Sequence, residues 1–431
     1  MSSSGEPAVD RPNSGQPAID LTDLDLFADG FPHEVFTRLR SEFPVWWHPP
    51  TRHTPDGTGF WVVSGHAGAI AVTSDPEAFS SERSPGHEGG GTLIEDLPYG
   101  SASGVLLNMM DDPRHKAIRR LVTPAFSPRE LSKLEAGLRE LTASTLEEAS
   151  KDGPFDFLVD VAAELPMRAT ASLMGVPLED RHKLVGWANA TLDHSGRELG
   201  ETTDVAMEAA ASMFAYGTDL MALKRSEPSA DILGMVAHGR IESDQGTTEP
   251  VSEMEQLMFF NLLSIAGSET TRNTMALGAA ALAENPEQWR MLREQVADDP
   301  RSATIATEEI LRWTSTTLYN RRSATRAVEL EGCQIAAGDK VTVWWTSANR
   351  DESVFSEPFS FDLLRDPNPH LAFGYRGHFC LGASLARLEI RILLEELATR
   401  FGSIELAGPI ERFRTNKHAG VRRMPIVLRR S

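Results

Sequence analysis

The chain has 431 residues, of which 41% are hydrophobic, and a formal net charge of −20. A chain of this length can bury a large core, and its negative charge disfavours binding to nucleic acid or to an anionic membrane surface. Because only two cysteines occur, Cys333 and Cys380, no disulfide framework is expected and the cytoplasm is the default location.

Residues 1–20 are rich in Ser, Pro and Gly, and they lack the basic start and apolar centre of a signal peptide. They are predicted to form a disordered arm. No linker-like stretch divides residues 21–431, which predicts a single domain for this part of the chain.

Helical periodicity dominates that domain, so the predicted fold class is mainly α with a small β region. Helices are predicted near residues 31–42, 112–125, 128–151, 156–174, 178–192 and 203–223, and a long helix follows Ser252. Short strands are predicted near residues 44–47, 59–63, 324–330 and 340–346. The glycine- and serine-rich span 81–104 is too long for a simple connector and indicates a lid or a disordered loop.

The helix after Ser252 has clear start and stop signals. Ser252 and Glu255 form a capping-box pattern, and Asn285-Pro286 ends the helix. Roughly 33 residues at about 1.5 Å each predict a rod of about 50 Å. Two charges near its centre, Glu269 and Arg272, argue for a buried helix and against a membrane span.

Glu269 and Thr270 place an acid beside an alcohol in this apolar helix, next to Ala266-Gly267, where the backbone can open. Such groups need solvation or a ligand when they are buried. In one interpretation the pair serves chemistry. In the other, the Thr270 hydroxyl bonds to a carbonyl of its own helix and Glu269 pairs with a nearby cation.

Cys380 stands between a glycine-rich loop and a predicted helix whose apolar positions begin at Leu381. At a helix start the unpaired amides and the macrodipole favour an anion, so the thiol is expected to ionise more readily than a free cysteine. The sulfur is then a nucleophile, a metal ligand or a buried structural thiol. His378 is two residues away, a spacing that rarely lets two side chains face each other, and the small residues and amides around the sulfur suit an iron ligand.

Four motifs follow one another along the chain. They are His115 with Arg119, the run Ala266-Gly267-Ser268-Glu269-Thr270-Thr271, the run Glu309-Ile310-Leu311-Arg312, and the run from Phe373 to Gly382 around Cys380. In this order they resemble the C helix, the oxygen-binding kink of the I helix, the K helix and the haem-ligand loop of the cytochromes P450, the haem-thiolate monooxygenases. The resemblance extends from about residue 21 to the C-terminus.

The resemblance implies the cytochrome P450 fold, a triangular prism in which the long central I helix crosses over the haem. It implies haem b (heme, iron protoporphyrin IX) with Cys380 as the iron ligand and with Ala266 and Gly382 beside the cofactor. Arg322, chosen over Arg321 by alignment, would bind the haem propionates together with three further residues: His115, Arg119 and His378. Span 81–104 and residues 193–203 would cover the substrate pocket.

The same resemblance implies roles for two residue pairs. Thr270 would steady dioxygen and Glu269 would relay protons from solvent, whereas Glu309 and Arg312 would form a buried ion pair that holds the cysteine loop. One residue departs from the family pattern: Arg376 stands where glycine is usual, four residues before the cysteine, with Gly377 one place later. Glycine accepts a positive φ there, so the arginine predicts a shifted turn.

The implied activity is a monooxygenase reaction on an apolar small molecule such as a terpenoid, a steroid, a branched lipid or a natural-product intermediate. The chain has no further cysteine set for an iron–sulfur cluster, so electrons are expected from NAD(P)H through a separate ferredoxin and ferredoxin reductase. The protein is expected to be a monomer. Two alternatives stay open: a peroxide-using or rearranging haem-thiolate enzyme, and a non-catalytic haem sensor or carrier.

Overall fold

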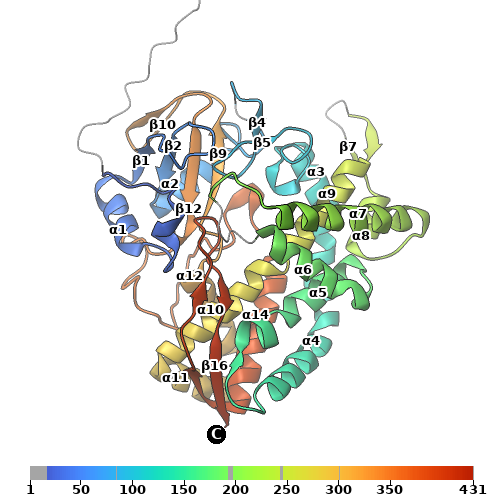
Figure 1. Cartoon of the computed structure of the whole chain (residues 1–431), viewed down its shortest axis with the longest axis vertical. Helices are drawn as coiled ribbons and strands as arrows, with labels where there is room; N and C mark the ends of the chain where they lie inside the picture. The colour runs from blue at the N-terminus through green and yellow to red at the C-terminus, as the bar shows by residue number, and fades with distance from the viewer. Residues whose placement is uncertain (1–16, 84, 193–197, 243–245, 300, 431) are drawn as a thin grey trace, which may run out of the picture.

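The structure is a computed structural model that describes residues 17–83, 85–192, 198–242, 246–299 and 301–430. Most of the predicted arm and residues 193–197 of the predicted pocket cover lie outside the described residues. Figure 1 shows a strand-rich region around β1, β2, β9 and β12 and a larger helical region from α3 to α14. The mainly helical class with a small β part is confirmed.

The described helices match most of the predicted ranges. They are α1 His33–Glu42, α2 His66–Ser74, α3 Arg114–Val122, α4 Pro128–Ala149, α5 Glu164–Met174, α6 Arg181–Leu192, α7 Asp204–Ser226, α8 Ile232–Ala237, α9 Glu253–Ala266, α10 Glu269–Glu284, α11 Pro286–Asp298, α12 Arg301–Thr314, α13 Trp345–Ala348 and α14 Ala383–Arg400. The predicted helix over 156–174 begins as a π-helical turn, Leu158–Ala162, and continues as α5. No described helix combines the length and apolar character that crossing a bilayer requires.

The long helix predicted after Ser252 is present, and it is interrupted at the position where the resemblance implied a kink. The capping box of Ser252 and Glu255 is present, but Gly267 and Ser268 separate α9 from α10. A Cβ on Gly267 would lie 2.7 Å from Thr170 Oγ1, so only glycine allows α5 to approach this closely. The Gly267 carbonyl, freed at the break, accepts a hydrogen bond of 3.2 Å from Thr170 Oγ1.

The strands form one five-stranded sheet, one three-stranded sheet and several two-stranded ribbons. They are β1 Val45–His48, β2 Phe60–Val63, β3 Phe79–Ser80, β4 Gly89–Gly90, β5 Leu97–Pro98, β6 Phe155–Asp156, β7 Arg240–Glu242, β8 Thr248–Pro250, β9 Tyr319–Ala324, β10 Val328–Leu330, β11 Cys333–Ile335, β12 Lys340–Trp344, β13 Phe401–Leu406, β14 Glu411–Arg412, β15 Val421–Arg423 and β16 Pro425–Arg430. The larger sheet has the order β1-β2-β12-β9-β3, and the smaller has the order β13-β16-β6.

Two strand predictions need correction. The single strand expected at 324–330 is the end of β9 followed by a separate ribbon strand, β10, and the C-terminal strands β13 to β16 were not predicted. In span 81–104, strands β4 and β5 pair as a short antiparallel ribbon.

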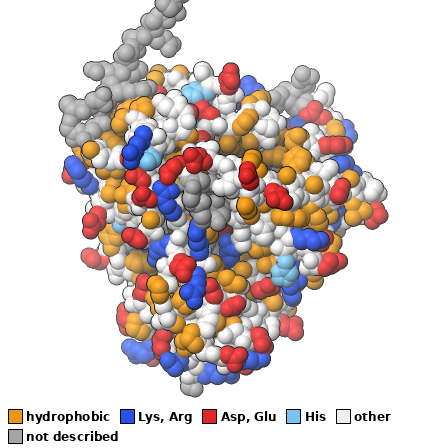
Figure 2. All heavy atoms as spheres, viewed as in Figure 1, with side chains coloured by type: hydrophobic (Ala, Val, Ile, Leu, Met, Phe, Trp, Pro, Cys, Tyr) orange, Lys and Arg blue, Asp and Glu red, His pale blue; other side chains and the backbone are white. Residues whose placement is uncertain are grey.

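Apolar side chains from α10, α11, α12, α14 and the C-terminal strands share one core cluster, and a second core cluster joins α3, α4, α7, α8 and α9. The two clusters meet along α9, α10 and α14, where the site residues lie. On the face seen in Figure 2, acidic and basic side chains are interspersed, so the negative net charge is not gathered into one patch there.

Candidate active site

A cavity lies between the α9–α10 break and the loop that carries Cys380. Eight of the nine site residues predicted from the sequence line it: His115, Arg119, Ala266, Thr270, Arg322, His378, Cys380 and Gly382. The ninth, Glu269, does not line it. Much of the remaining wall is apolar and comes from Leu107, Phe126, Leu173, Met174, Phe259, Leu262, Leu263 and Leu385. The cavity therefore joins a mainly apolar chamber to a thiol and a group of cationic and donor side chains.

Cys380 is held just before α14. Its amide donates to the Phe373 carbonyl over 2.8 Å, and Gly382 is the residue that caps the helix. The amides of Gly382 and Ala383 hydrogen-bond to the sulfur, and they favour the thiolate together with the charge of Arg119. Cys380 is exposed at the cavity wall, yet desolvation by the surrounding protein atoms outweighs these effects and raises its pKa. The prediction of an easily ionised thiol is thus wrong for the chain by itself, whereas direct coordination to a metal removes a thiol proton outright.

The cationic end of the cavity consists of Arg119, Arg322 and two stacked imidazoles. The rings of His115 and His378 lie 4.1 Å apart between centroids. Arg119 donates to the Phe379 carbonyl, and His378 Nε2 lies 3.1 Å from Ser81 Oγ. Burial lowers the pKa of both histidines, and nearby cations lower that of His378 further, so both rings are neutral at pH 7.

Arg322 is more buried than Arg119, the other arginine of this group. Only 5% of its surface is exposed, and its guanidinium donates to the Arg321 carbonyl over 2.8 Å. No ion pair joins Arg322 or Arg119 to a carboxylate of the described chain, and the buried His115 Nε2 has no hydrogen-bond partner. Buried cations and donors without an acid partner are costly unless a ligand supplies the negative charge. These residues therefore fit a cofactor that brings its own carboxylates, as haem does with its propionates.

Arg321 and Arg322 are neighbours on β9, and their side chains lie on opposite faces of the strand. Arg322 and Asn320 line the cavity, whereas Arg321 points away and pairs with Asp96 over 2.7 Å. Successive side chains of a strand face opposite sides, so a residue and its second neighbour share a face. This period of two could have identified Asn320 as a cavity residue, and sequence reasoning missed it.

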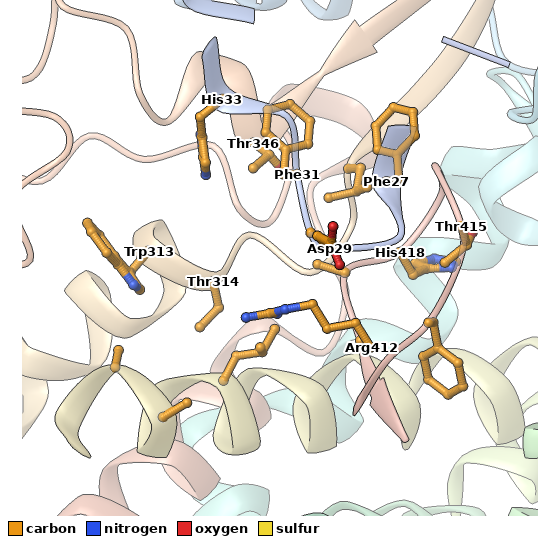
Figure 3. Close-up of a pocket in the computed structure, with 18 of the residues that line it drawn as sticks. Phe27, Asp29, Phe31, His33, Trp313, Thr314, Thr346, Arg412, Thr415 and His418 are labelled. Carbon is orange, nitrogen blue, oxygen red and sulfur yellow. The ribbon is translucent and has the colours of Figure 1, made fainter. Parts of the chain in front are cut away.

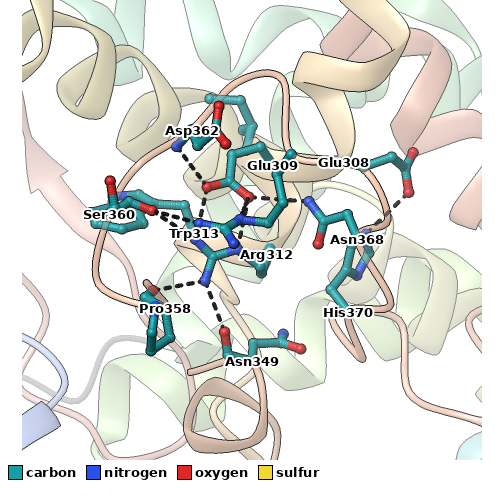
Figure 4. A network of polar contacts seen from close by, with 12 residues as sticks. Glu308, Glu309, Arg312, Trp313, Asn349, Pro358, Ser360, Asp362, Asn368 and His370 are labelled. Atoms are coloured by element: carbon teal, nitrogen blue, oxygen red, sulfur yellow. Dashed lines mark hydrogen bonds and ion pairs between the residues drawn. The ribbon is translucent and has the colours of Figure 1, made fainter. Parts of the chain in front are cut away.

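Glu309 and Arg312 form the predicted buried ion pair, which is confirmed. Two hydrogen bonds of 2.7 Å join them, and both side chains are 0% exposed. Figure 4 shows the guanidinium also reaching the carbonyls of Asn349, Pro358 and Ser360. The side chain of Asn349 accepts from the Leu371 amide over 2.6 Å, so the pair is linked to the segment that leads into the cysteine loop.

Thr270 and Glu269 lie differently although they are neighbours. Thr270 faces the cavity, and its hydroxyl donates to the Ala266 carbonyl over 2.9 Å, the intrahelical bond considered above as an alternative. Glu269 is buried, and desolvation raises its pKa to about 7 although Arg272 opposes the shift. At neutral pH this carboxyl is therefore close to half-protonated and is able to take up or release a proton.

Arg376 does not shift the turn as predicted. It adopts φ +57°, the left-handed conformation that glycine usually takes, while Gly377 has no positive φ. The guanidinium lies 5.2 Å from the centre of the Tyr375 ring, a cation–π contact that offsets part of the backbone strain.

Comparison with known proteins identifies the family. The model of the family described as cytochrome P450 matches residues 195–416. A putative cytochrome P450 126 of Mycobacterium tuberculosis is 47% identical over 417 residues, which cover 96% of this chain and 99% of that relative. The chain belongs to the cytochrome P450 family.

Further relatives of this P450 have descriptions that state a reaction or a bound compound. A methyl-branched lipid omega-hydroxylase of Mycobacterium tuberculosis is 33% identical over 436 residues, covering 98% of this P450 and 96% of the relative. The structure of a Mycobacterium marinum cytochrome P450 in complex with pseudoionone matches with a TM-score of 0.84 at 32% identity and covers 96% of this P450 and 100% of that chain. This P450 is thus a haem-iron monooxygenase with the mainly helical fold of its family.

Proposed function

We propose that this P450 hydroxylates or epoxidises an apolar small molecule of the terpenoid, steroid or branched-lipid type, or a related natural-product intermediate. The observation that carries the proposal is the apolar chamber opposite Cys380, walled by residues such as Phe259, Leu262 and Leu263. Apolar walls with few polar groups select apolar substrates. The methyl-branched lipid hydroxylase and the pseudoionone complex among its relatives point to the same classes.

Within this proposal, Cys380 is the iron ligand of haem b, and Ala266 and Gly382 contact the cofactor. His115, Arg119, Arg322 and His378 hold its propionates. The assignment is supported by Arg119 and Arg322, which pair with no carboxylate of the described chain, and by the buried Nε2 of His115, which has no hydrogen-bond partner. Haem, when bound, supplies the activation of dioxygen, and the chain positions the substrate against it.

Proton delivery is assigned to Glu269 and Thr270. Glu269 holds a proton near neutral pH because of its burial, and Thr270 presents a hydroxyl at the cavity surface. A group with a pKa near the working pH is best suited to donate and recover protons. Thr270→Ala should lower the fraction of reductant consumption that yields product. Thr218 lies on the exposed face of α7, and its hydroxyl donates to the Phe214 carbonyl in the same way. Thr218→Ala should therefore leave that fraction unchanged. Full coupling in Thr270→Ala would contradict this role.

Electrons are proposed to come from NAD(P)H through a ferredoxin and its reductase. Three exposed cations near the cysteine side, Lys116, Arg120 and Arg376, form no ion pair with any described residue and are available to an acidic donor. Residues 21–431 are proposed to act as a single domain in a monomeric, cytoplasmic protein.

Substrate-dependent NAD(P)H consumption with surrogate redox partners tests the proposal. The substrate is first selected by a high-spin shift of the haem spectrum in a panel of terpenoids, steroids and branched fatty acids. We expect consumption of NAD(P)H and dioxygen with an oxygenated product. Product formation with peroxide alone would favour the peroxide-using alternative, and binding without turnover would favour a sensor or carrier.

A further inference from the structure

A second cavity lies farther along the same face of α10. Thr270 and Thr274 line the cavity beside Cys380, whereas Leu277, Ala281 and Glu284 line the second one. These positions follow one another at steps of three and four residues, the spacing of one helix face. The second cavity has a volume of about 270 Å³, near the lower end of the range for small-molecule sites.

Aromatic side chains form much of its wall. Phe31, Trp313, Phe359 and Phe413 come from four separate segments and surround the space into which a planar ring would fit. In Figure 3, Phe31 and Trp313 lie on the wall, and the Arg412 guanidinium extends across the space toward Thr314. Aromatic walls favour a ligand with an aromatic body because ring pairs add to the energy of apolar burial.

Three polar side chains that line the second cavity have hydrogen-bonding capacity left over in the described chain. Arg412 is half-buried, and no hydrogen bond or ion pair joins its guanidinium to a described residue. Nε of Arg350, whose surface is 1% exposed, and Nδ1 of His33 are buried without a hydrogen-bond partner. Burial and nearby cations lower the pKa of His33 to about 3, so the ring is neutral. A cavity with aromatic walls, a cationic side chain and an unused hydrogen-bond donor favours a ligand that carries an acceptor. A carboxylate is the strongest such acceptor.

Two carboxylates complete the lining. Asp29 and Glu284 are exposed, and no described residue forms an ion pair with either of them. Asp29 points into the cavity without pairing with Arg412. Asp29 is therefore able to accept a hydrogen bond from a ligand bound in the cavity.

We infer that the second cavity binds a small aromatic acid that carries a hydrogen-bond donor at its other end. The carboxylate contacts Arg412, the ring lies between Phe31 and Trp313, and the donor faces Asp29. An aminobenzoate has this arrangement of groups. The site is separate from the cavity beside Cys380, where the proposed monooxygenase substrate binds.

One short segment forms part of the wall of both cavities. Thr316 and Thr317 line the cavity beside Cys380, while Thr314 and Leu318 on the same short segment line the second. The Leu318 amide donates to the Lys417 carbonyl over 3.0 Å, and the Ala419 amide donates to the Thr316 carbonyl over 2.8 Å. The two cavities therefore share one short segment that backbone hydrogen bonds tie to residues 417–419.

Isothermal titration of the haem-loaded protein with 4-aminobenzoate tests the inference. A haem-coordinating azole is kept present, so that the cavity beside Cys380 is blocked. Benzoate, which lacks the donor, and aniline, which lacks the acid, are the comparison ligands. We expect one 4-aminobenzoate per chain and weaker binding of both comparison ligands.

Two variants and a control locate the site. Arg412→Gln should weaken 4-aminobenzoate and benzoate by about tenfold, because a charged hydrogen bond is lost. Asp29→Asn should weaken 4-aminobenzoate and leave benzoate unchanged. The control Arg423→Gln removes an arginine of the neighbouring strand β15 that does not line the cavity, and it should bind as the parent does. Absence of binding up to the solubility limit, or binding that neither variant weakens, would overturn the inference. Since no turnover is measured, failure here leaves the monooxygenase proposal untouched.

Discussion

Replacing Arg312 with alanine tests how the buried ion pair supports the haem site. The substitution strands the Glu309 carboxylate, which is fully buried, and removes the donors to the carbonyls of Asn349, Pro358 and Ser360. Glu309 retains the Asp362 amide at 2.9 Å, the Asn368 side-chain amide at 3.1 Å and the Arg365 guanidinium at 3.3 Å. The carboxylate is thus only partly compensated.

Breaking a buried pair by removing one partner costs about 3–5 kcal/mol. The free energy of unfolding of a typical domain is only about 5–15 kcal/mol, so the loss is a large share of it. Arg312 donates to the Asn349 carbonyl, and the Asn349 side chain accepts from the Leu371 amide, which precedes the cysteine loop. Haem retention should therefore fall together with stability. The expected product is largely haem-free protein.

Haem content per chain and urea unfolding measure both effects. Arg290→Ala is the matched control, because its pair with Glu294 has the side chains 70% and 66% exposed and should be worth less than about 1 kcal/mol. A double variant, Glu309→Leu with Arg312→Leu, should be more stable than Arg312→Ala alone because it leaves no buried carboxylate, although it removes the acid partner of Arg365. Normal haem content and normal stability in Arg312→Ala would refute the reasoning.

Three further predictions concern Glu269, Arg376 and Arg322. Glu269 has a pKa of about 7 in the folded chain against an ordinary value of 4.5. Between these two pH values the folded chain binds more protons at this residue than the unfolded chain does. The free energy of unfolding therefore falls as pH rises from 4.5 to 7, by on the order of 3 kcal/mol. Glu269→Gln should remove this contribution from the pH dependence, measured in urea titrations of variant and parent at a series of pH values, and an unchanged pH dependence would contradict the assignment. Arg376→Gly should raise the free energy of unfolding by about 1 kcal/mol by relieving the positive φ, and a loss of stability would show that the contact with Tyr375 matters more. Arg322→Ala should speed haem transfer to apomyoglobin roughly tenfold, whereas Arg321→Ala should mainly destabilise the fold at Asp96; equal transfer rates would contradict the division of roles.

Patterns among residues close together in the sequence predicted much of the fold and of the candidate site. Ser252 and Glu255 fixed the start of α9 because a capping box is made by neighbouring residues alone. Periodicity did not indicate the interruption at Gly267, since apolar positions continue through it; the resemblance and the small residues Ala266-Gly267 did, whereas the close contact of Gly267 with Thr170 appears only in the structure. The C-terminal strands were missed because their pairing joins segments that lie far apart in the sequence, such as β16 with β6.

The chemistry of single groups depends even more on tertiary structure. The helix start at Cys380 predicted a lowered pKa, yet burial by the surrounding fold outweighs the local amides. For Glu269 the sequence showed an acid in an apolar helix but not that the side chain turns away from the cavity lined by Thr270. The choice of Arg322 over Arg321 depends on the register of β9, which places alternate residues on opposite faces.

The central claim is that the Cys380 sulfur coordinates the haem iron, and the absorption spectrum of the reduced, carbon-monoxide-bound protein tests it most directly. The parent should show the strongly red-shifted Soret band of a thiolate ligand, and Cys380→Ser should lack it. An unshifted band in the parent, or the same red-shifted band in Cys380→Ser, would contradict the account.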